Sequence, residues 1–184
     1  MPAVCNACSQ LEGYGGCCQV PLTYQELQLP ITLSDVQKIS DFTSKSFDEF
    51  VEIDSVSSYA MINFNSLSPL IKSQIIDGFR IKLKLKPNGE CIFLKSGEGC
   101  TIKSVRPSVC KLFPFLPDDE GNLVPSLGKS CLANHLASQN NSDILTMLEQ
   151  DEDELLSEVE ELKKNIEVHH KKMHPLLKSF NIIN

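Results

Sequence analysis

The sequence predicts a mostly helical α+β protein, in which a small cysteine-rich metal-binding domain carries one β-hairpin and a long C-terminal helix. Three observations lead to this class: eight cysteines in two groups, several helix-capping patterns, and one strictly alternating segment at 79–86. The chain has 184 residues, of which 41% are hydrophobic and 22% charged, as in ordinary globular proteins. We expect residues 1–140 to form the cysteine-cluster domain and 141–184 an amphipathic helical extension.

The charge balance narrows the classes of partner. The chain carries 17 basic and 24 acidic residues, for a net charge of −7. An acidic chain is a poor ligand for nucleic acid or anionic lipid. No apolar run approaches the roughly 18 residues of a membrane span, and the stretch from Met1 to Cys5 lacks the pattern of a signal peptide. We therefore expect a cytoplasmic protein with no nucleic-acid and no membrane partner.

Two capping boxes open the first predicted helices. The segment 32–35 reads Thr-Leu-Ser-Asp, which predicts a helix running through Ile39 and Phe42. The segment 46–49 reads Ser-Phe-Asp-Glu and predicts a second, short helix. Asp35 is a candidate proton-transfer group, as are Tyr14 and Tyr24, but a helix cap explains Asp35 equally well.

A third helix and the hairpin follow. Pro69 suits the first turn of a helix over 69–77, and Gly78 suits its C-terminal stop. The alternation of residues 79–86 predicts a strand with one wet face. A turn at Pro87–Gly89 leads to a returning strand at 91–94, which completes the hairpin.

Two short helices are expected to carry cysteines. Pro107 suits the first turn of a helix that holds Cys110, and Pro114 ends it. The segment 130–136 is a second candidate and holds Cys131 and His135.

From Asn141 onward the pattern predicts one long helix, which Pro175 ends or kinks. Its apolar stripe follows alternating spacings of four and three residues: Leu155, Val159, Leu162, Ile166, His169 and Met173. About three heptads are short for an independent coiled coil. We therefore expect the stripe to pack on the helix around Val36, Ile39 and Phe42, in a monomer rather than a dimer.

The cysteines are the candidate metal ligands: Cys5, Cys8, Cys17, Cys18, Cys91, Cys100, Cys110 and Cys131. Without an export signal, this many ordered thiols favour metal ligation over disulfides. Cys5 and Cys8 form a C-x-x-C unit, a spacing shared with redox dithiols, but no strand precedes it as in thioredoxin-type proteins. Cys17 and Cys18 are adjacent, which suits a cluster or two neighbouring sites better than one ion.

The second group is flanked by glycines and cations. Gly97 and Gly99 allow a turn that presents Cys100. A four-thiolate site holding Zn²⁺ or a [4Fe–4S]²⁺ cluster carries a net charge of −2, so nearby cations are expected. We predict that Arg106 and Lys111 contact the cofactor and offset this charge.

Two further charged patterns have alternative interpretations. His170 and His174 have the i,i+4 spacing of a helical metal pair, although, with His169, they fit a solvated or interface face of the helix better. The basic face of the alternating segment, formed by Arg80, Lys82, Lys84 and Lys86, suits an anion site or, more simply, a solvated surface.

The order of these cysteine motifs resembles that of a known family. After C-x-x-C and C-C come, in order, Cys91–Leu94, Cys100–Ile102, Arg106–Cys110 and Phe113–Phe115. This arrangement resembles the YkgJ-type cysteine-cluster family, also called the CxxCxxCC domain, over Cys5 to Cys131. The Leu33–Val36 segment is similar to the family's Asp segment. One difference is that eight residues separate Cys8 from Cys17, a wider spacing than is usual in the family.

The resemblance implies zinc or iron chelation, and flagellin lysine methylases with a similar cysteine pattern link it to iron–sulfur chemistry. We therefore expect a metal-binding protein whose eight thiolates converge on zinc or an iron–sulfur cluster, with a slight preference for iron. One alternative is an iron–sulfur enzyme that modifies a protein or peptide side chain. Another is a metal-stapled interaction module that acts through the C-terminal helix.

Overall fold

The computed structural model describes residues 18–19, 22–95, 98–125, 132–133, 136, 144–180 and 182–183. Four of the eight cysteines lie within these ranges: Cys18, Cys91, Cys100 and Cys110. The other four, with Tyr14, Gly97 and His135, lie outside the described residues, as does most of the predicted helix at 130–136.

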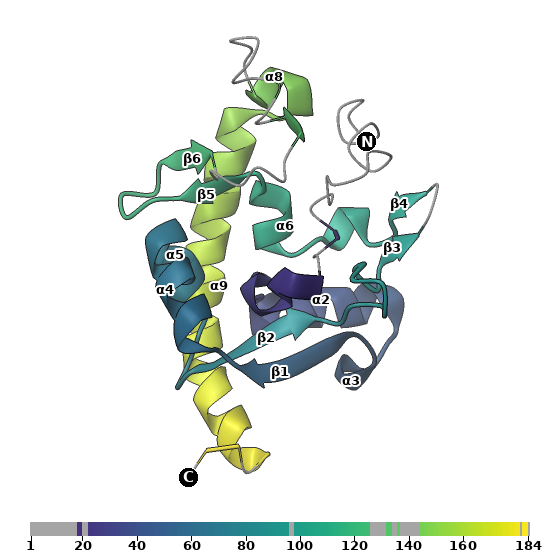
Figure 1. The fold of residues 1–184 in the computed structure, drawn as a ribbon, viewed down its shortest axis with the longest axis vertical. Coiled ribbons are helices and arrows are strands. Elements are labelled where there is room, and N and C mark those ends of the chain that lie inside the picture. Colours follow the sequence, from purple (N-terminus) through teal and green to yellow (C-terminus); the bar gives the residue numbers. More distant parts are fainter. Residues whose placement is uncertain are drawn as a thin grey trace.

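The longest element is helix α9 (Glu152–Ser179), which runs along the whole described part of the molecule (Figure 1). Asp151 caps it, because its carboxylate accepts a hydrogen bond from the Glu154 amide at 3.0 Å. Three acidic residues in the first turn, Glu152 to Glu154, interact favourably with the positive end of the helix dipole. These features establish the long C-terminal helix that the sequence predicts.

The predicted start of this helix is wrong, and of the two roles predicted for Pro175 the structure excludes the ending of the helix. A separate short helix, α8 (Ile144–Leu148), precedes α9, and Glu149 between them has a φ of +52°. A left-handed residue stops a helix, so the chain cannot continue as one rod from Asn141. Pro175 lies inside α9 and does not end it. The buried side chains of Met173 and Leu177 on either side hold this stretch, despite the hydrogen bond that proline cannot donate.

Both capping boxes form as predicted. Helix α2 (Leu33–Thr43) starts at Thr32, whose side chain accepts from the Asp35 amide while Asp35 accepts from the Thr32 amide. Helix α3 (Phe47–Phe50) has the equivalent pair in Ser46 and Glu49. Both patterns are local, so the sequence places these helix starts correctly.

The main sheet differs from the predicted hairpin. Strand β2 (Phe79–Leu83) pairs antiparallel with β1 (Val51–Ser55), an element that the sequence analysis missed. The turn at Pro87–Gly89 does form, and Leu85 makes an isolated bridge to Cys91. The chain then turns again, because the Leu94 amide bonds to the Cys91 carbonyl at 2.9 Å. The returning segment is therefore a bridge and a turn, and β1 supplies the partner strand.

The remaining described elements are short. The 3₁₀ helix η1 (Leu22–Leu27) precedes α2, and α4 (Ser58–Leu67) and α5 (Pro69–Lys72) follow β1. Helix α5 begins at Pro69 as predicted but ends well before the predicted stop at Gly78. After β2 the order is β3 (Leu94–Lys95), β4 (Gly99–Cys100), the 3₁₀ helix η2 (Lys103–Val105), α6 (Ser108–Leu112), β5 (Phe115–Pro117) and β6 (Leu123–Pro125).

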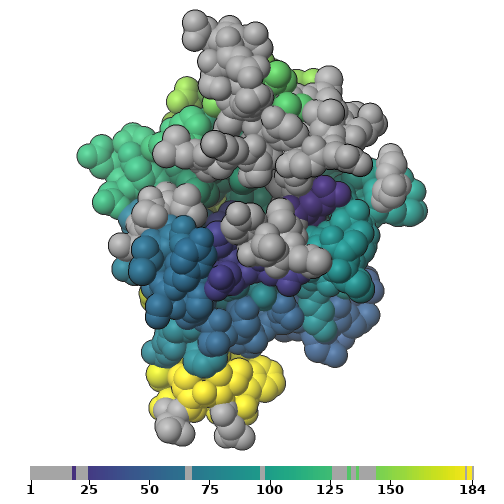
Figure 2. All heavy atoms as spheres, viewed as in Figure 1, coloured from purple at the N-terminus to yellow at the C-terminus, as the bar shows by residue number. Residues whose placement is uncertain are grey.

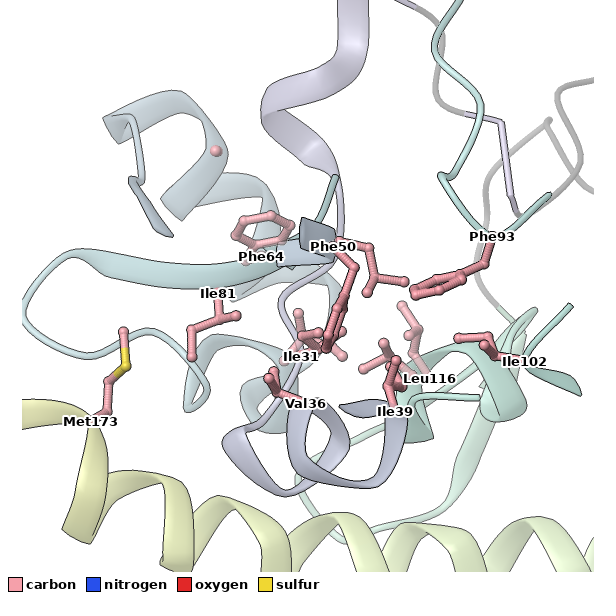
Figure 3. Packing of buried hydrophobic residues seen from close by; sticks show 14 of the residues in the cluster. Ile31, Val36, Ile39, Phe50, Phe64, Ile81, Phe93, Ile102, Leu116 and Met173 are labelled. Atoms are coloured by element: carbon pink, nitrogen blue, oxygen red, sulfur yellow. The ribbon is translucent and has the colours of Figure 1, made fainter. Parts of the chain in front are cut away.

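Two clusters of buried side chains form the core. The first contains Phe50, Phe64 and Phe93, with the Phe50 and Phe93 rings 5.7 Å apart (Figure 3). The second joins Leu112 of α6 to Leu162 and its neighbours on α9. Burial of this apolar area is the dominant stabilising contribution.

The predicted stripe of α9 is buried within the chain. Leu155, Val159, Leu162 and Ile166 belong to the second cluster, and Met173 packs in the first. In the first cluster Met173 shares the core with Val36 and Ile39 of α2, as predicted, whereas Phe42 is 53% exposed.

Among the helices of the described residues, none combines the length and the apolar character that a membrane span requires.

Candidate metal centre

Three cysteines of the second group lie on neighbouring turns and strands. Cys91 starts the turn that leads into β3, and Leu94 of β3 pairs directly with Cys100 of β4. The Thr101 amide donates to the Phe93 carbonyl at 2.9 Å, which closes this small ribbon. Cys110 lies in the middle of α6, which follows η2.

Cys91, Cys100 and Cys110 all pack against the first core cluster. Each is half-buried, so none is sequestered completely in the core. Phe93 and Ile102, which lie next to these cysteines in sequence, point into the core at one end of the cluster (Figure 3). Burial of these two side chains therefore fixes the turns that carry Cys91 and Cys100.

The structure joins the two cysteine groups through the backbone. The Cys91 amide donates to the Cys18 carbonyl at 2.7 Å, and Gln19 makes an antiparallel bridge to Glu90. Figure 1 shows β3 and β4 at one edge of the molecule, beside the purple stretch of residues 18–19. Segments that are over 70 residues apart in sequence are thus neighbours in space.

Within the described residues, no group of three or more His, Cys, Asp or Glu side chains is arranged to hold a metal ion. Cys5, Cys8, Cys17 and Cys131 lie outside those residues, so the predicted convergence of all eight sulfurs stays a prediction. The structure brings the backbones of Cys18 and Cys91 together, through the hydrogen bond from the Cys91 amide to the Cys18 carbonyl.

Asp35 connects the capped start of α2 to the helix that carries Cys110. One carboxylate oxygen accepts from the Thr32 amide at 2.9 Å and from the Thr32 hydroxyl at 2.7 Å. The other accepts from the Ser108 amide at 3.2 Å, at the first residue of α6. Burial raises the pKa of Asp35, against the opposing effect of these hydrogen bonds. The sequence analysis found the cap but missed the link to α6, which no local pattern encodes.

The two predicted cofactor-binding cations have different surroundings. The Lys111 ammonium group pairs with Glu158 of α9 at 2.9 Å. Arg106 directly precedes Pro107 and α6, and its Nε is buried without a hydrogen-bond acceptor among the described residues. An unpaired buried donor costs about 1–3 kcal/mol, so Arg106 is suited to an anionic neighbour.

Half of the basic face of the alternating segment is buried, namely Arg80 and Lys82. Arg80 is 1% exposed and Lys82 is 8% exposed, so the prediction of a wet face is wrong at these positions. Lys82 pairs with Glu52 at 3.1 Å and Asp54 at 2.8 Å. Burial raises the pKa of Asp54, but hydrogen bonds and charge from Arg80 and Lys82 outweigh it and lower the pKa overall. These cations neutralise carboxylates of β1.

The three histidines of α9 fasten the helix to the turn after α5. His169 is fully buried, with Nδ1 accepting from the Leu33 amide and Nε2 donating to the Gln74 carbonyl, both at 3.1 Å. Burial lowers the pKa of His169 to about 4, so the ring is neutral. His170 Nε2 lies 2.6 Å from the Ser73 carbonyl, and His174 Nδ1 lies 2.6 Å from Asp77. These contacts agree with the prediction that the histidine face of the helix forms an interface, here with other segments of the same chain.

The described residues thus define a mostly helical α+β protein in which Cys91, Cys100 and Cys110 are half-buried against the first core cluster. Residues 4–135 match the model of the CxxCxxCC family, described as "Putative zinc- or iron-chelating domain". Because the match covers more than half of the chain, the protein belongs to this family. No curated protein and no solved structure matches it.

Proposed function

We propose that this protein chelates zinc or iron through thiolates from both of its cysteine groups. The observation that carries the proposal is the 2.7 Å hydrogen bond from the Cys91 amide to the Cys18 carbonyl. It brings Cys18, the described member of the N-terminal group, to the second group in a chain whose family is described as zinc- or iron-chelating. Thiolates are the ligands preferred by zinc and by iron–sulfur clusters.

The surroundings of the thiols fit such a metal. Cys91, Cys100 and Cys110 are half-buried against a rigid core, which orients them without removing them from a ligand's reach. The buried Nε of Arg106 offers a donor to a negatively charged thiolate site. The proposed ligand set is the full set of eight cysteines, and the adjacent pair Cys17–Cys18 favours an iron–sulfur cluster over a single zinc ion.

The bound metal would serve to cross-link short elements that have little other support. Strands β3 and β4 pair over only two residues, and α6 is five residues long. A structural thiolate site can contribute about 10–16 kcal/mol in zinc-finger peptides, where the fold depends on the metal. In this chain we expect a smaller effect, confined to the cysteine-bearing edge, because the core packs independently of it.

An interaction role through the stripe of α9 is less suitable. That stripe packs inside the chain, where Leu162 and Met173 are both 0% exposed. It offers no apolar surface to a partner, which also supports the proposal of a monomer.

Anaerobic purification of the full chain, followed by metal analysis and an absorption spectrum, tests the proposal. A broad visible band with iron and sulfide identifies a cluster, whereas a colourless protein with bound zinc identifies a zinc site. Cys100→Ser and Cys110→Ser should each lower the metal content, and Ser104→Ala, an exposed change in the same region, should not. Full metal content in both cysteine variants, or a wild-type chain that takes up neither metal, would contradict the proposal.

A further inference from the structure

Arg80 of β2 is the largest fully buried side chain among the described residues, at 1% exposure. Its Nε and one terminal nitrogen donate to the two oxygens of Asp54, at 2.8 and 3.2 Å. Its other terminal nitrogen donates to the carbonyls of Glu26 and Gln28, at 2.8 and 2.6 Å. The guanidinium also lies 5.5 Å from the centre of the Phe64 ring.

A buried arginine is energetically unfavourable at this position. A buried ion pair costs a large desolvation energy, and apolar residues of similar volume often stabilise a core better. What an arginine adds is geometry, since its planar fork can bind a carboxylate and other acceptors in fixed directions. Here the other acceptors are two main-chain carbonyls of one segment, so Arg80 fixes the path of that segment against the sheet.

The segment in question is the one that follows the N-terminal cysteines. Glu26 lies in η1 and Gln28 directly after it, and η1 begins only four residues beyond Cys18. Four residues span at most about 14 Å. Fixing η1 therefore confines Cys18 to the neighbourhood of Cys91. Figure 2 shows purple atoms of this segment between the blue atoms of the α4 region and the teal atoms of the region after β2.

We infer that Arg80 is a positioning residue for the proposed metal centre, in that it holds Cys18, the described member of the N-terminal cysteine group, near Cys91 of the second group. This inference rests on the proposed function. Without Arg80, the next backbone anchor on the sheet is the Ile31 amide, which donates to the Ile81 carbonyl at 2.9 Å. The tether from Cys18 to its nearest main-chain anchor then lengthens from eight residues (to Glu26) to thirteen (to Ile31), which lowers the local concentration of the Cys18 thiol about twofold.

The test compares Arg80→Lys with Lys82→Met. Lysine keeps a charge for Asp54 but cannot reach both carbonyls of the η1 segment. Lys82 is the matched control, because it lies on the same strand and binds the same carboxylate without touching η1. Two properties are measured: the alkylation rate of each cysteine in the metal-loaded chain, and the hydrogen-exchange rate of the Cys91 amide in the metal-free chain.

In Arg80→Lys we expect Cys17 and Cys18 to be alkylated about twofold faster while Cys91, Cys100 and Cys110 keep their wild-type rates. The Cys91 amide should also exchange about twofold faster without metal. A general loss of stability would expose all cysteines together. Lys82→Met should match the wild type in both measurements.

Wild-type rates of cysteine alkylation and of Cys91 exchange in Arg80→Lys would overturn the positioning role. If instead metal protects no cysteine in the wild-type chain, the proposed metal function fails, and the metal-free exchange of Cys91 alone decides the role of Arg80. Should Arg80→Lys fail to fold, Gln28→Ala tests the same contact between the η1 segment and β2. This change removes the hydrogen bond from the Gln28 side chain to the Leu83 carbonyl at 2.7 Å. In Gln28→Ala the alkylation of Cys17 and Cys18 should also be faster, by a smaller factor, while Cys91, Cys100 and Cys110 keep their wild-type rates. Equal changes in both cysteine groups would mean that the inference is wrong.

Discussion

Strands β1 and β2 pair over five residues beside the first core cluster, whereas β3 and β4 pair over two residues at the edge that carries Cys100. The first pair is reinforced by Arg80 and by buried Ile81. The second depends on a few backbone hydrogen bonds and on Phe93 as its inward anchor. The comparison indicates that the core holds its shape by burial and extended pairing, whereas the β3–β4 ribbon, where we propose a metal cross-link, has less pairing of its own.

The largest effect is expected in the core. Leu162 is 0% exposed at the centre of the α6–α9 contact, so Leu162→Ala should lower the free energy of unfolding by about 2–5 kcal/mol. Leu156 on the same helix is 38% exposed, and Leu156→Ala should have a much smaller effect. Urea denaturation of both variants measures the difference. Equal losses would mean that α9 is not packed on α6 as described.

His169 should make the stability of the core depend on pH. Its pKa is about 4 in the folded chain and 6.5 in the reference state, so the unfolded chain binds the proton first as pH falls. Stability should therefore decrease between pH 6.5 and pH 4, by up to about 3 kcal/mol, and this contribution should be constant above that range.

The variant His169→Gln, measured by urea denaturation across this range, should lose that part of the pH dependence. His170→Gln is the control, because His170 is exposed, lies against the Ser73 carbonyl, and has the smallest of the effects on the pKa of His169. The pKa of Asp35 is raised by burial, so its contribution to stability decreases as pH rises, opposite to that of His169. The informative quantity is therefore the difference between the two variants in the slope of stability against pH. An unchanged slope in His169→Gln would show that the ring is not buried as a neutral group.

The capping boxes of α2 and α3 provide a smaller test, because only the α2 box is also bonded to α6, the helix that carries Cys110. Asp35→Ala removes the carboxylate half of the α2 capping box and also the bond to the Ser108 amide, so we expect a loss of about 1–2 kcal/mol. It should also speed hydrogen exchange in α6, around Cys110. Glu49→Ala removes the equivalent cap at the exposed start of α3 and should leave α6 unchanged. A similar response of α6 to both changes would contradict the link through Asp35.

The smallest expected effect is that of metal removal on the core. Chelation should reduce the helical circular-dichroism signal by less than about a tenth, because the opened region is small and local. Hydrogen exchange over residues 91–112 should increase in the same sample. Loss of most of the helical signal on chelation would show instead that the metal supports the whole fold.

Local patterns were the part of this fold that could be predicted. The pairs Thr32–Asp35 and Ser46–Glu49 encode helix starts within four residues, and both form. Asp151 and Glu154 show a similar pattern, but it does not stand out within an acidic run. The sequence analysis therefore does not detect the break before α9.

Partnerships between distant segments could not be predicted. The alternation at 79–86 indicates a strand but not its partner, and β1 lies about 30 residues earlier. The burial of Arg80 follows from acceptors on β1 and η1, which no spacing along β2 reveals. For the candidate site, the cysteine order was sufficient to predict the family, whereas the contact between Cys18 and Cys91 required the structure.

The contact between His169 and Leu33 spans 136 residues, and this has a consequence for synthesis of the chain. Chains emerge from the ribosome N-terminus first. Val36 and Ile39 are therefore without Met173 and Leu177, their partners in the first core cluster, until translation has passed Leu177. All eight cysteines emerge before this closure. The nascent protein thus presents its thiols during a period in which the scaffold that orients them is still incomplete.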